Sequence, residues 1–508
     1  MGLHRVSTKT ICNDIIEGNG NIMKKHTRNA LCLLAILLLS SACNSTDTET
    51  IVTTEQSTET IAAETEYSRI AEIGEYDFGG ETFVIIDEDG SINVNTNTPD
   101  EALKGDIVND TVAKRNDLFS ELYNIEFQYM KISDMSQRTQ TLRRSVMAGD
   151  NEYDLIFSSL KDSLVPLSTE GILNDLCTIE QLTLDAEWWS PQIYENCRVG
   201  GKLYFTTGDI SPISYRSLAC YYANETLLDA YQIPKDDIYA HVENGTWTID
   251  VLHAYASDLD QDLNNDNTMY TDDDFFGILN EDNNLSAACF MTAAGINLSY
   301  IKDDGSLAAD LNNEDVIFAI EKLSDTISNA KRKDNNSTHT AFMEDRVVFF
   351  MHFTAAGYNR YRDMKSDYMV LPLPKYDESQ ENYISMMNTY MSPFVAVPHT
   401  ADIERAGVIM EAMAFWSKDE LRTAGFDMAL KEKGSRNEKD SVMLDTIVNA
   451  MYLDFNAFME FGNSITPIAN AIYKKSEYVS AAEKIKNNMN KAIEKFSDSW
   501  IGAGEMTE

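Results

Sequence analysis

Residues 153–159 read YDLIFSS, a short apolar run that ends in two serines and has the length of a buried strand. The run TFVII at Thr82–Ile86 has the same character. Between them, Ile125, Phe127 and Tyr129 alternate with polar residues, which is the pattern of a strand with one buried face. The first 85 residues of the folded part therefore contain three predicted strands.

A predicted helix separates each pair of these strands. Gly105 to Tyr123 carries apolar side chains at helical spacing, and a second helix follows through Met147. The order strand, helix, strand, helix, strand is typical of a parallel sheet in an α/β fold. Ligands bind such sheets beyond the carboxyl ends of the strands, and Ser159 lies at one of those ends.

The chain beyond residue 200 continues with more predicted strands and helices. Thr248 is a predicted helix cap, a helix is expected from Asp402 to Trp416, and the remainder reads as helical, with an amphipathic run beginning at Val479. Six further segments are strand-like: Lys202–Ile210, Leu218–Ala223, Phe275–Leu279, Arg346–Phe353, Tyr368–Leu373 and Ser392–Val397.

The segment before the folded part has the pattern of a bacterial export signal. Residues 23–43 read MKKHTRNALCLLAILLLSSAC, with a basic start, a short apolar core and small residues before Cys43. The apolar run is shorter than the roughly 20 residues that a membrane span needs. We expect residues 1–42 to be a signal peptide, with Met23 as the candidate true start. Lipid on the Cys43 thiol would anchor the chain to the outer face of the cell membrane.

Residues 43–75 are rich in Thr and Glu and predict an acidic linker that cannot bury enough surface to fold. The chain has 41 basic and 82 acidic residues, a net charge of −41, and such a surface repels nucleic acid. Cys177, Cys197, Cys220 and Cys289 show neither the density of a disulfide scaffold nor zinc spacing. They are predicted to be small buried side chains, with one bridge as the alternative.

Several phrases, in their order, resemble the extracellular solute-binding proteins of ABC importers, particularly the sugar-binding group that includes the maltose-binding protein. The resemblance covers nearly all of residues 76–500. It departs from the family at residues 223–225, ANE, where an Asn-Lys pair is usual. The matching phrases are YDLIFSS before LSTEGILNDL, GKLYFTTGDI before SLACYYANETLL, NGTWTID, FMEDRVVFFMHFTAAGY, and YMVLPLPKYDESQ before SPFVAVPHTADIERAGVIMEAMAFWS.

The resemblance implies an α/β, two-lobed, periplasmic-binding-protein-like (type II) fold that closes on a ligand about a hinge. Lobe 1 would comprise residues 76–212 plus 371–416, and lobe 2 residues 213–370 plus 417–508. The hinge would pass near Ser211 to Tyr215 and near Asp367 to Leu371. Pro212 and Pro372 suit such crossings because proline fixes φ.

A sugar site needs flat aromatic faces for the ring C–H groups and polar groups for the hydroxyls. The resemblance places Tyr358 at an aromatic position of the second lobe, and the segment that contains Asp209, Tyr215 and Arg216 beside the hinge. Neighbouring residues of an extended chain point opposite ways, so only one of Trp188 and Trp189 can face a ligand. The predicted ligand-binding residues are Ser159, Trp188, Trp189, Asp209, Tyr215, Arg216 and Tyr358.

A second constellation has the spacing of an EF-hand-like calcium loop. Its expected ligands are Asp262, Asn264, Asp266, the backbone carbonyl of Thr268, and Asp273 at the twelfth place. Tyr270 at the ninth place and Asp in place of Glu at the twelfth depart from the motif. The alternative is an acidic, solvated loop.

No H-E-x-x-H, G-x-S-x-G, P-loop or G-x-G-x-x-G motif occurs, and the histidines after Cys43 show no ligand spacing. We therefore expect a non-enzymatic, monomeric, lipid-anchored receptor that delivers an external solute, of carbohydrate class, to ABC permease subunits. Structural calcium is the one expected cofactor. A surface glycoside-active enzyme and the binding component of a sensor remain alternatives.

Overall fold

The computed structural model describes residues 70–88, 97–328, 330–331 and 336–503. The predicted signal, Cys43 and most of the linker lie outside these residues. The described residues form two compact units, one of 70–82 with 118–126 and one of 83–117 with 127–503. In the described part, no helix combines the length and apolarity that crossing a membrane requires.

The smaller unit is organised by aromatic rings. Phe78 stacks on Tyr76 with ring centroids 5.7 Å apart and meets Tyr123 at 6.4 Å. The Phe78 amide donates to the Tyr123 carbonyl at 3.0 Å, and the Gly80 amide donates to the Asn124 carbonyl at 2.7 Å. These contacts join the start of the folded chain to the end of a helix.

A mixed four-stranded sheet has the order β11-β3-β1-β2. Strands β1 and β3 are parallel with Ile85 opposite Leu155, whereas β11 is antiparallel to β3 with Val395 opposite Phe157. The predicted strand–helix alternation is confirmed. The elements of this part are β1 Glu81–Asp87, α3 Ile107–Tyr123, β2 Ile125–Lys131, α4 Met135–Ala148, β3 Leu155–Ser158, α5 Val165–Thr169, α6 Pro191–Cys197, β11 Phe394–Ala396 and α14 Ile403–Ser417.

A second four-stranded sheet has the order β5-β8-β4-β9. Strand β4 is antiparallel to both neighbours, and its Tyr221 lies opposite Met351 on β8 and Leu371 on β9, while β5 is parallel to β8. Pro372 is the last residue of β9. The elements are β4 Ala219–Asn224, α7 Glu225–Ala230, α8 Lys235–Glu243, α9 Ile249–Ala256, β5 Phe276–Leu279, α12 Ser337–Met343, β8 Val347–Phe353, α13 Ala355–Asn359 and β9 Tyr368–Pro372.

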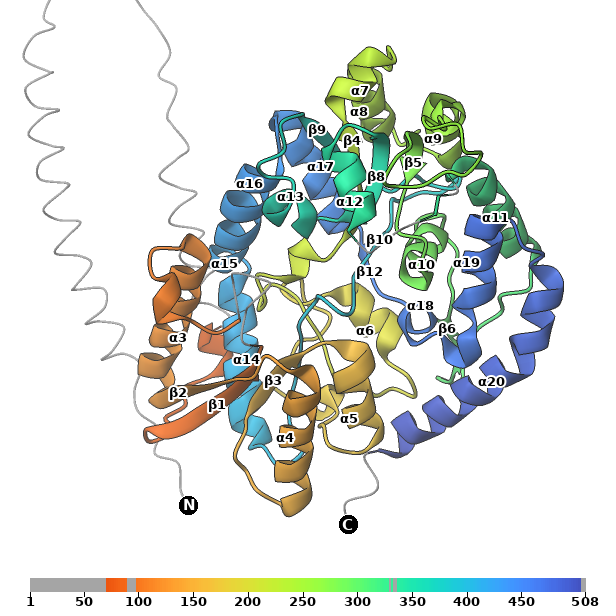
Figure 1. Ribbon diagram of the computed structural model, residues 1–508. Helices are drawn as coiled ribbons and strands as arrows, with labels where there is room; N and C mark the ends of the chain where they lie inside the picture. The colour runs from red at the N-terminus through yellow and green to blue at the C-terminus, as the bar shows by residue number, and fades with distance from the viewer. Residues whose placement is uncertain (1–69, 89–96, 329, 332–335, 504–508) are drawn as a thin grey trace, which may run out of the picture. The chain divides into compact units, whose positions relative to one another are not determined.

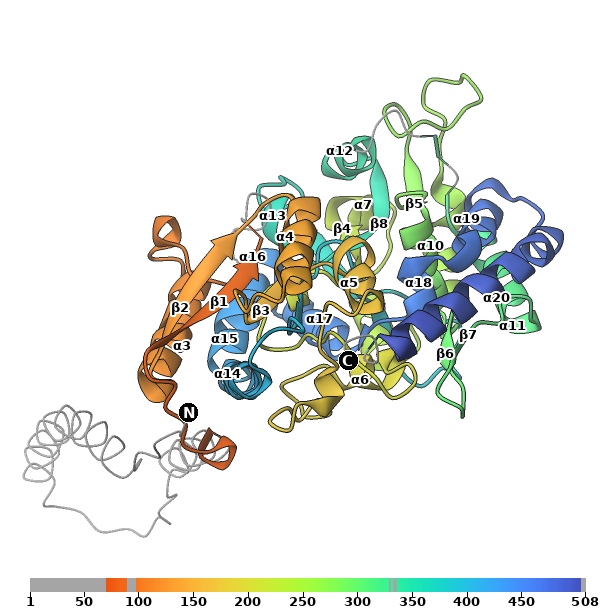
Figure 2. The ribbon, with the colours of Figure 1, turned by 90° about the horizontal axis from the view of Figure 1, so that it is seen from below.

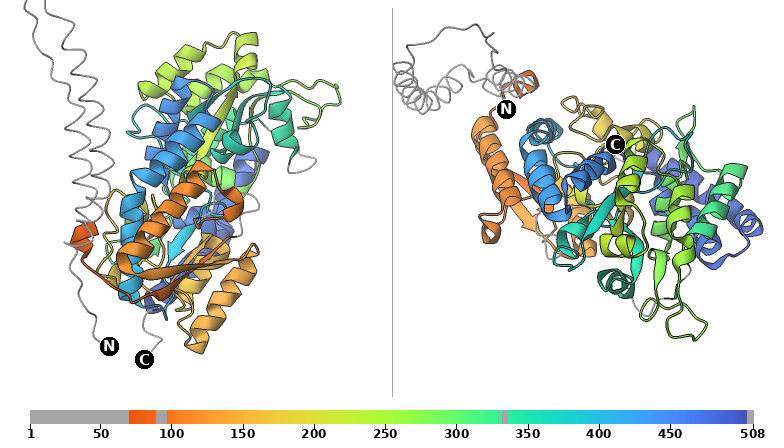
Figure 3. Two further views of the ribbon diagram at one scale, coloured as in Figure 1. Left: turned by 90° about the vertical axis from the view of Figure 1, so that its left-hand side faces the viewer. Right: turned by 90° about the horizontal axis from the view of Figure 1, so that it is seen from above.

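Helices α10, α11 and α19 pack against one another (Figures 1 and 3), and α20 lies beside α5 (Figure 2). The buried faces of α20 carry Met489 and Phe496, as the amphipathic pattern predicts. The remaining elements are α10 Asn284–Ala293, β6 Tyr300–Ile301, β7 Leu307–Ala308, α11 Glu314–Thr326, β10 Ser385–Met386, α15 Glu420–Arg422, α16 Glu432–Gly434, α17 Glu438–Asn449, β12 Met451–Tyr452, α18 Phe455–Met459, α19 Ile465–Lys474 and α20 Val479–Gly502.

Most predicted elements are confirmed, and helix caps account for several boundaries. The side chains of Thr248 and Asp402 accept hydrogen bonds from the first turns of α9 and α14. The strand expected at Lys202–Ile210 is wrong: this buried segment makes only isolated bridges, one of them between Thr206 and Val395. Its partners change along its length, so no continuous ladder forms.

The four described cysteines are free thiols. Cys197, Cys220 and Cys289 are buried, as expected, but Cys177 is exposed. The expected burial is therefore correct for three of them and wrong for the fourth.

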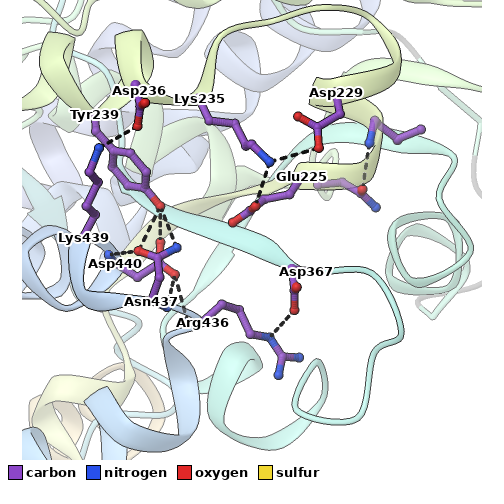
Figure 4. Close-up of polar contacts among 12 residues, drawn as sticks. Glu225, Asp229, Lys235, Asp236, Tyr239, Asp367, Arg436, Asn437, Lys439 and Asp440 are labelled. Atoms are coloured by element: carbon purple, nitrogen blue, oxygen red, sulfur yellow. Dashed lines mark hydrogen bonds and ion pairs between the residues drawn. The ribbon is translucent and has the colours of Figure 1, made fainter.

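A buried polar cluster around Asp440 joins α8, β9 and α17 (Figure 4). Asp440 Oδ1 accepts from the Tyr239 hydroxyl at 2.8 Å and the Val370 amide at 3.1 Å, and Oδ2 accepts from the amides of Arg436 and Asn437 at 2.9 and 3.3 Å. Asp440 also completes a capping box with Asn437 at the start of α17. The cluster thus holds a helix terminus against a strand and a second helix.

Candidate functional site

Two short helical segments bring together predicted ligand residues that are distant in sequence. A 3₁₀ turn, Ser214–Arg216, packs against a π-helical segment, Thr423–Lys431. The chain just before the turn lies close to the π-helical segment: a Cβ at Gly425 would lie 3.1 Å from Cβ of Pro212. A side chain at Gly425 would therefore push this segment away from the predicted hinge.

Asp209 and Tyr215 form the first half of what we call the cation–aromatic cluster. The Tyr215 hydroxyl donates to Asp209 Oδ1, and Arg422 Nη1 lies 3.5 Å from the same oxygen. Burial raises the pKa of Asp209 to about 6, against the lowering effects of Tyr215 and Arg422. Arg422 also lies over the ring of Phe426, 5.8 Å from its centroid.

Arg216 and Tyr358 form the second half of the cluster. The Arg216 guanidinium lies 4.1 Å from the centroid of the Tyr358 ring, within the range of a cation–π interaction. Lys433 approaches the same ring, with Nζ 3.4 Å from the hydroxyl oxygen. Burial lowers the pKa of Arg216, while Tyr358 and Asp106 oppose that shift.

The two adjacent tryptophans have different environments. Trp189 is buried, and its indole Nε1 donates to Glu411 Oε2 at 2.8 Å. Trp188 is half-buried, meets Phe415 edge to face at 5.1 Å, and has its carbonyl bonded to the Asp209 amide at 3.0 Å. Of the pair, Trp188 is the better candidate to face a ligand.

Ser159 follows β3, as the sequence predicts, and its hydroxyl donates to Met135 Sδ at 2.7 Å. Separately, a hollow of about 340 Å³ is lined by residues of α5, α18, α20 and the chain around Phe461, and contains none of the predicted ligand residues. The predicted ligand set is therefore brought together only in part, at the cation–aromatic cluster.

The sequence did not single out Arg422, Phe426 or Lys433. They lie more than 200 residues beyond Asp209, on a segment whose sequence reads as an ordinary helix. The one feature that could have drawn attention to this segment is Gly425, which interrupts the helical pattern of residues 423–433, TAGFDMALKEK.

The predicted calcium loop is a tight turn with its own internal bonds. Asn267 has φ +61°, the left-handed conformation expected of it. Asp262 accepts from the Asn267 amide at 2.8 Å, and Asp266 accepts from the Thr268 amide at 2.8 Å. The fully buried Asp274, which follows the exposed Asp273, accepts from the amides of Leu263 and Tyr270 and so closes the loop.

No protein-family model and no curated protein matches the sequence. Solved structures do match. A cyclo/maltodextrin-binding protein complexed with maltotetraose aligns with a TM-score of 0.54 at 15% identity, covering 82% of this chain and 96% of the other. An ABC substrate-binding protein, Lmo0181 from Listeria monocytogenes, in complex with cycloalternan, aligns at 0.50 and 11% identity, over 82% and 99%.

UspC of M. tuberculosis aligns with a TM-score of 0.50 at 12% identity, covering 81% of this chain and 100% of the other. Structural similarity at identities this low establishes the fold and not the function. Together with the two four-stranded sheets and the helices between their strands, the alignments show that this chain has the two-lobed, type II fold of the ABC substrate-binding proteins.

Proposed function

We propose that this chain is the solute-binding receptor of an ABC importer and that it captures a carbohydrate outside the cell. The observation that carries the proposal is the alignment over nearly the whole length of proteins solved with maltotetraose and cycloalternan. The predicted lobe boundaries, 76–212 plus 371–416 and 213–370 plus 417–508, belong to the same proposal.

The cation–aromatic cluster supports carbohydrate as the ligand class. The rings of Tyr215, Phe426 and Tyr358 supply apolar faces, and Asp209, Arg216 and Arg422 supply hydrogen-bonding groups around them. Sugars require this combination because their rings present C–H faces bordered by hydroxyls. Trp188, half-buried and bonded through its backbone to Asp209, would extend the surface.

The direct test is calorimetric titration of the purified chain with linear maltodextrins, cyclic glucans, monosaccharides and short peptides. We expect saturable binding of an oligosaccharide with no change in its length after prolonged incubation. Shortened products would favour the glycoside-active enzyme. Binding confined to peptides would overturn the carbohydrate assignment.

Replacing Tyr358 by Ala tests the site itself. We expect sugar affinity to fall by about 1.5–3 kcal/mol, roughly 10- to 150-fold in Kd, because an aromatic face against the sugar is lost. Calorimetry of the variant beside a urea melt measures both effects. Trp189→Ala is the matched control, since Trp189 is bonded to Glu411 in the interior: it should lose about 3–5 kcal/mol of stability, and its folded fraction should bind normally. If Tyr358→Ala behaves like this control, Tyr358 belongs to the core.

Delivery to a permease and attachment through Cys43 complete the proposal. The export pattern of residues 23–43 supports attachment by lipid. A Cys43→Ala chain should be released from the membrane fraction into the medium, and retention of a correctly exported variant would contradict lipid attachment. Loss of labelled-sugar uptake when the gene is deleted, restored by the intact chain, would support delivery.

We also propose structural calcium in the loop that begins at Asp262. The carboxylates of Asp262 and Asp266, the left-handed Asn267 and the carbonyl of Thr268 support it. Calcium should raise the melting temperature of the chain but not that of a variant with Asp262→Ala and Asp266→Ala. If neither calcium nor EDTA changes the melting temperature of the intact chain, the loop does not bind structural calcium.

A further inference from the structure

We propose that Glu281, His339 and His352 form a binding site for one divalent transition-metal ion of the zinc class. Their candidate ligand atoms, one from each side chain, all lie within 4.8 Å of one another. The three residues are separated by 58 and 13 positions in the sequence, so they form no local metal-binding motif. The proposal is independent of the sugar site.

The fold places these residues at one end of the parallel strands β5 and β8. Glu281 follows the carboxyl end of β5 by two residues, and His352 is the last residue but one of β8. His339 comes from α12, the helix that immediately precedes β8. Sites beyond the carboxyl ends of parallel strands are where α/β folds characteristically bind ligands.

Neighbouring groups hold two of the three ligands in position. His339 Nδ1 is 2.6 Å from the hydroxyl of Tyr361, which leaves Nε2 directed towards Glu281 Oε1 at 3.8 Å. The other carboxylate oxygen, Oε2, accepts from Asn283 Nδ2 at 3.1 Å. Metal-binding histidines and carboxylates are commonly oriented by such outer hydrogen bonds.

His352 supplies the second imidazole. Its ring centroid is 4.4 Å from that of His339, and among the described residues its buried Nδ1 has no hydrogen-bond partner. Burial lowers the pKa of His339 to about 2 and that of His352 to about 4. Neutral imidazole is the form of histidine that binds metal ions.

The donor set selects the class of ion. Two imidazole nitrogens and one carboxylate oxygen suit Zn²⁺, Co²⁺, Ni²⁺ or Cu²⁺, whereas Ca²⁺ and Mg²⁺ prefer oxygen ligands. Around tetrahedral zinc with bonds of about 2.0–2.1 Å, ligand atoms lie roughly 3.4 Å apart. The three atoms lie within 4.8 Å of one another, so binding requires closures of up to about 1.4 Å. The Glu281 side chain is 26% exposed and has room to make that movement.

Arg360 opposes the bound cation. Arg360 is exposed, its charge contributes to the lowered pKa values of both histidines, and its guanidinium donates to Asn336 Oδ1 at 3.3 Å. Arg360→Gln should therefore tighten metal binding about two- to tenfold, because a like charge is removed near the ion. A structural role for Arg360 alone would not predict this gain.

The test uses the purified chain without a polyhistidine tag, freed of metal by chelation. Calorimetry with ZnCl₂ should show one tight equivalent, and CoCl₂ should give the visible absorption of four-coordinate cobalt. Glu281→Gln and His352→Gln should each weaken zinc binding at least about tenfold, and His399→Gln, on a loop elsewhere, should leave it unchanged. Circular dichroism confirms folding, and Glu281→Gln decides the matter if His352→Gln does not fold.

Equal zinc affinity of the intact chain and Glu281→Gln would overturn the site, as would cobalt that stays in six-coordinate, aqueous-like form. No sugar is needed for any of these measurements. Failure of the metal site would therefore leave the proposed function untouched, and failure of sugar binding would leave the metal site untouched.

Discussion

Asp440 and Asp209 are both buried carboxylates, yet their partners differ in kind. Three of the four donors to Asp440 are backbone amides, two from the residues that lead into α17 and one from β9 (Figure 4). The partners of Asp209 on its carboxylate are side chains, the Tyr215 hydroxyl and the guanidinium of Arg422, which is 36% exposed. Backbone donors cannot withdraw without unfolding an element, whereas side chains can change rotamer.

This difference separates a structural cluster from an adjustable one. The Asp440 cluster fixes where α17 begins and which strand it touches, so its loss should damage folding. The Asp209 cluster joins the predicted hinge to the π-helical segment Thr423–Lys431 through contacts that a ligand hydroxyl could replace. We expect mutations in the first to change stability and mutations in the second to change ligand binding and pH response.

Asp440→Ala should have the largest effect. It leaves the amides of Val370, Arg436 and Asn437 without their acceptor, and buried donors left unsatisfied each cost about 1–3 kcal/mol. We expect a loss of at least about 3 kcal/mol in a urea melt, with normal sugar affinity in the folded fraction. Asp236→Ala, which removes only the exposed partner of Lys439, is the control and should leave the melt unchanged. Equal free energies of unfolding for the two variants would mean that the Asp440 cluster does not stabilise the fold.

Asp209→Asn should change how stability depends on pH. The pKa of Asp209 is raised to about 6 from an ordinary value of 3.8, so the folded chain binds a proton that the unfolded chain has released between these values. The stability that Asp209 contributes is present below about pH 4 and is lost as pH rises through 6. At 1.36 kcal/mol per pKa unit, the variant should gain up to about 3 kcal/mol over the parent between pH 4 and pH 7.

Urea melts of both proteins at intervals from pH 4 to pH 7 measure this difference. Burial also raises the pKa values of Asp87 and Asp454 to about 6. The stability of the variant should therefore still fall between pH 4 and pH 7, but less steeply than that of the parent. Parallel profiles for the two proteins would show that folding does not change the pKa of Asp209, contrary to the value of about 6 in the folded chain.

Arg422→Gln should have the smallest effect. Arg422 is partly exposed and 3.5 Å from Asp209, so its ion pair and its contact with Phe426 are each worth under about 1 kcal/mol. We expect a small loss of stability, weaker at high salt, and a further rise in the pKa of Asp209. Arg143→Gln, which removes an exposed pair with Glu170, is the control and should leave the pKa of Asp209 where it is. A loss as large as that of Asp440→Ala would place Arg422 in the structural class.

Local features were predicted well because few residues decide them. Thr248 and Asp402 cap helices, and Asn267 takes the left-handed turn, since each depends on hydrogen bonds or sterics within a few positions. The segment Lys202–Ile210 was misread for the converse reason: its apolar run Leu203–Phe205 has the composition of a strand, but no neighbouring chain pairs with it for more than single bridges.

The sequence by itself determined the strand–helix order, the helix caps and the acidic surface, because these depend on residue spacing and composition. Only the tertiary structure decided what lies together: β11 beside β3, Arg422 beside Asp209, and His339 beside His352. The members of each pair are separated along the chain by a distance that follows no helical or strand periodicity. Such contacts form only when helices and strands pack against one another, so a local sequence pattern cannot predict them.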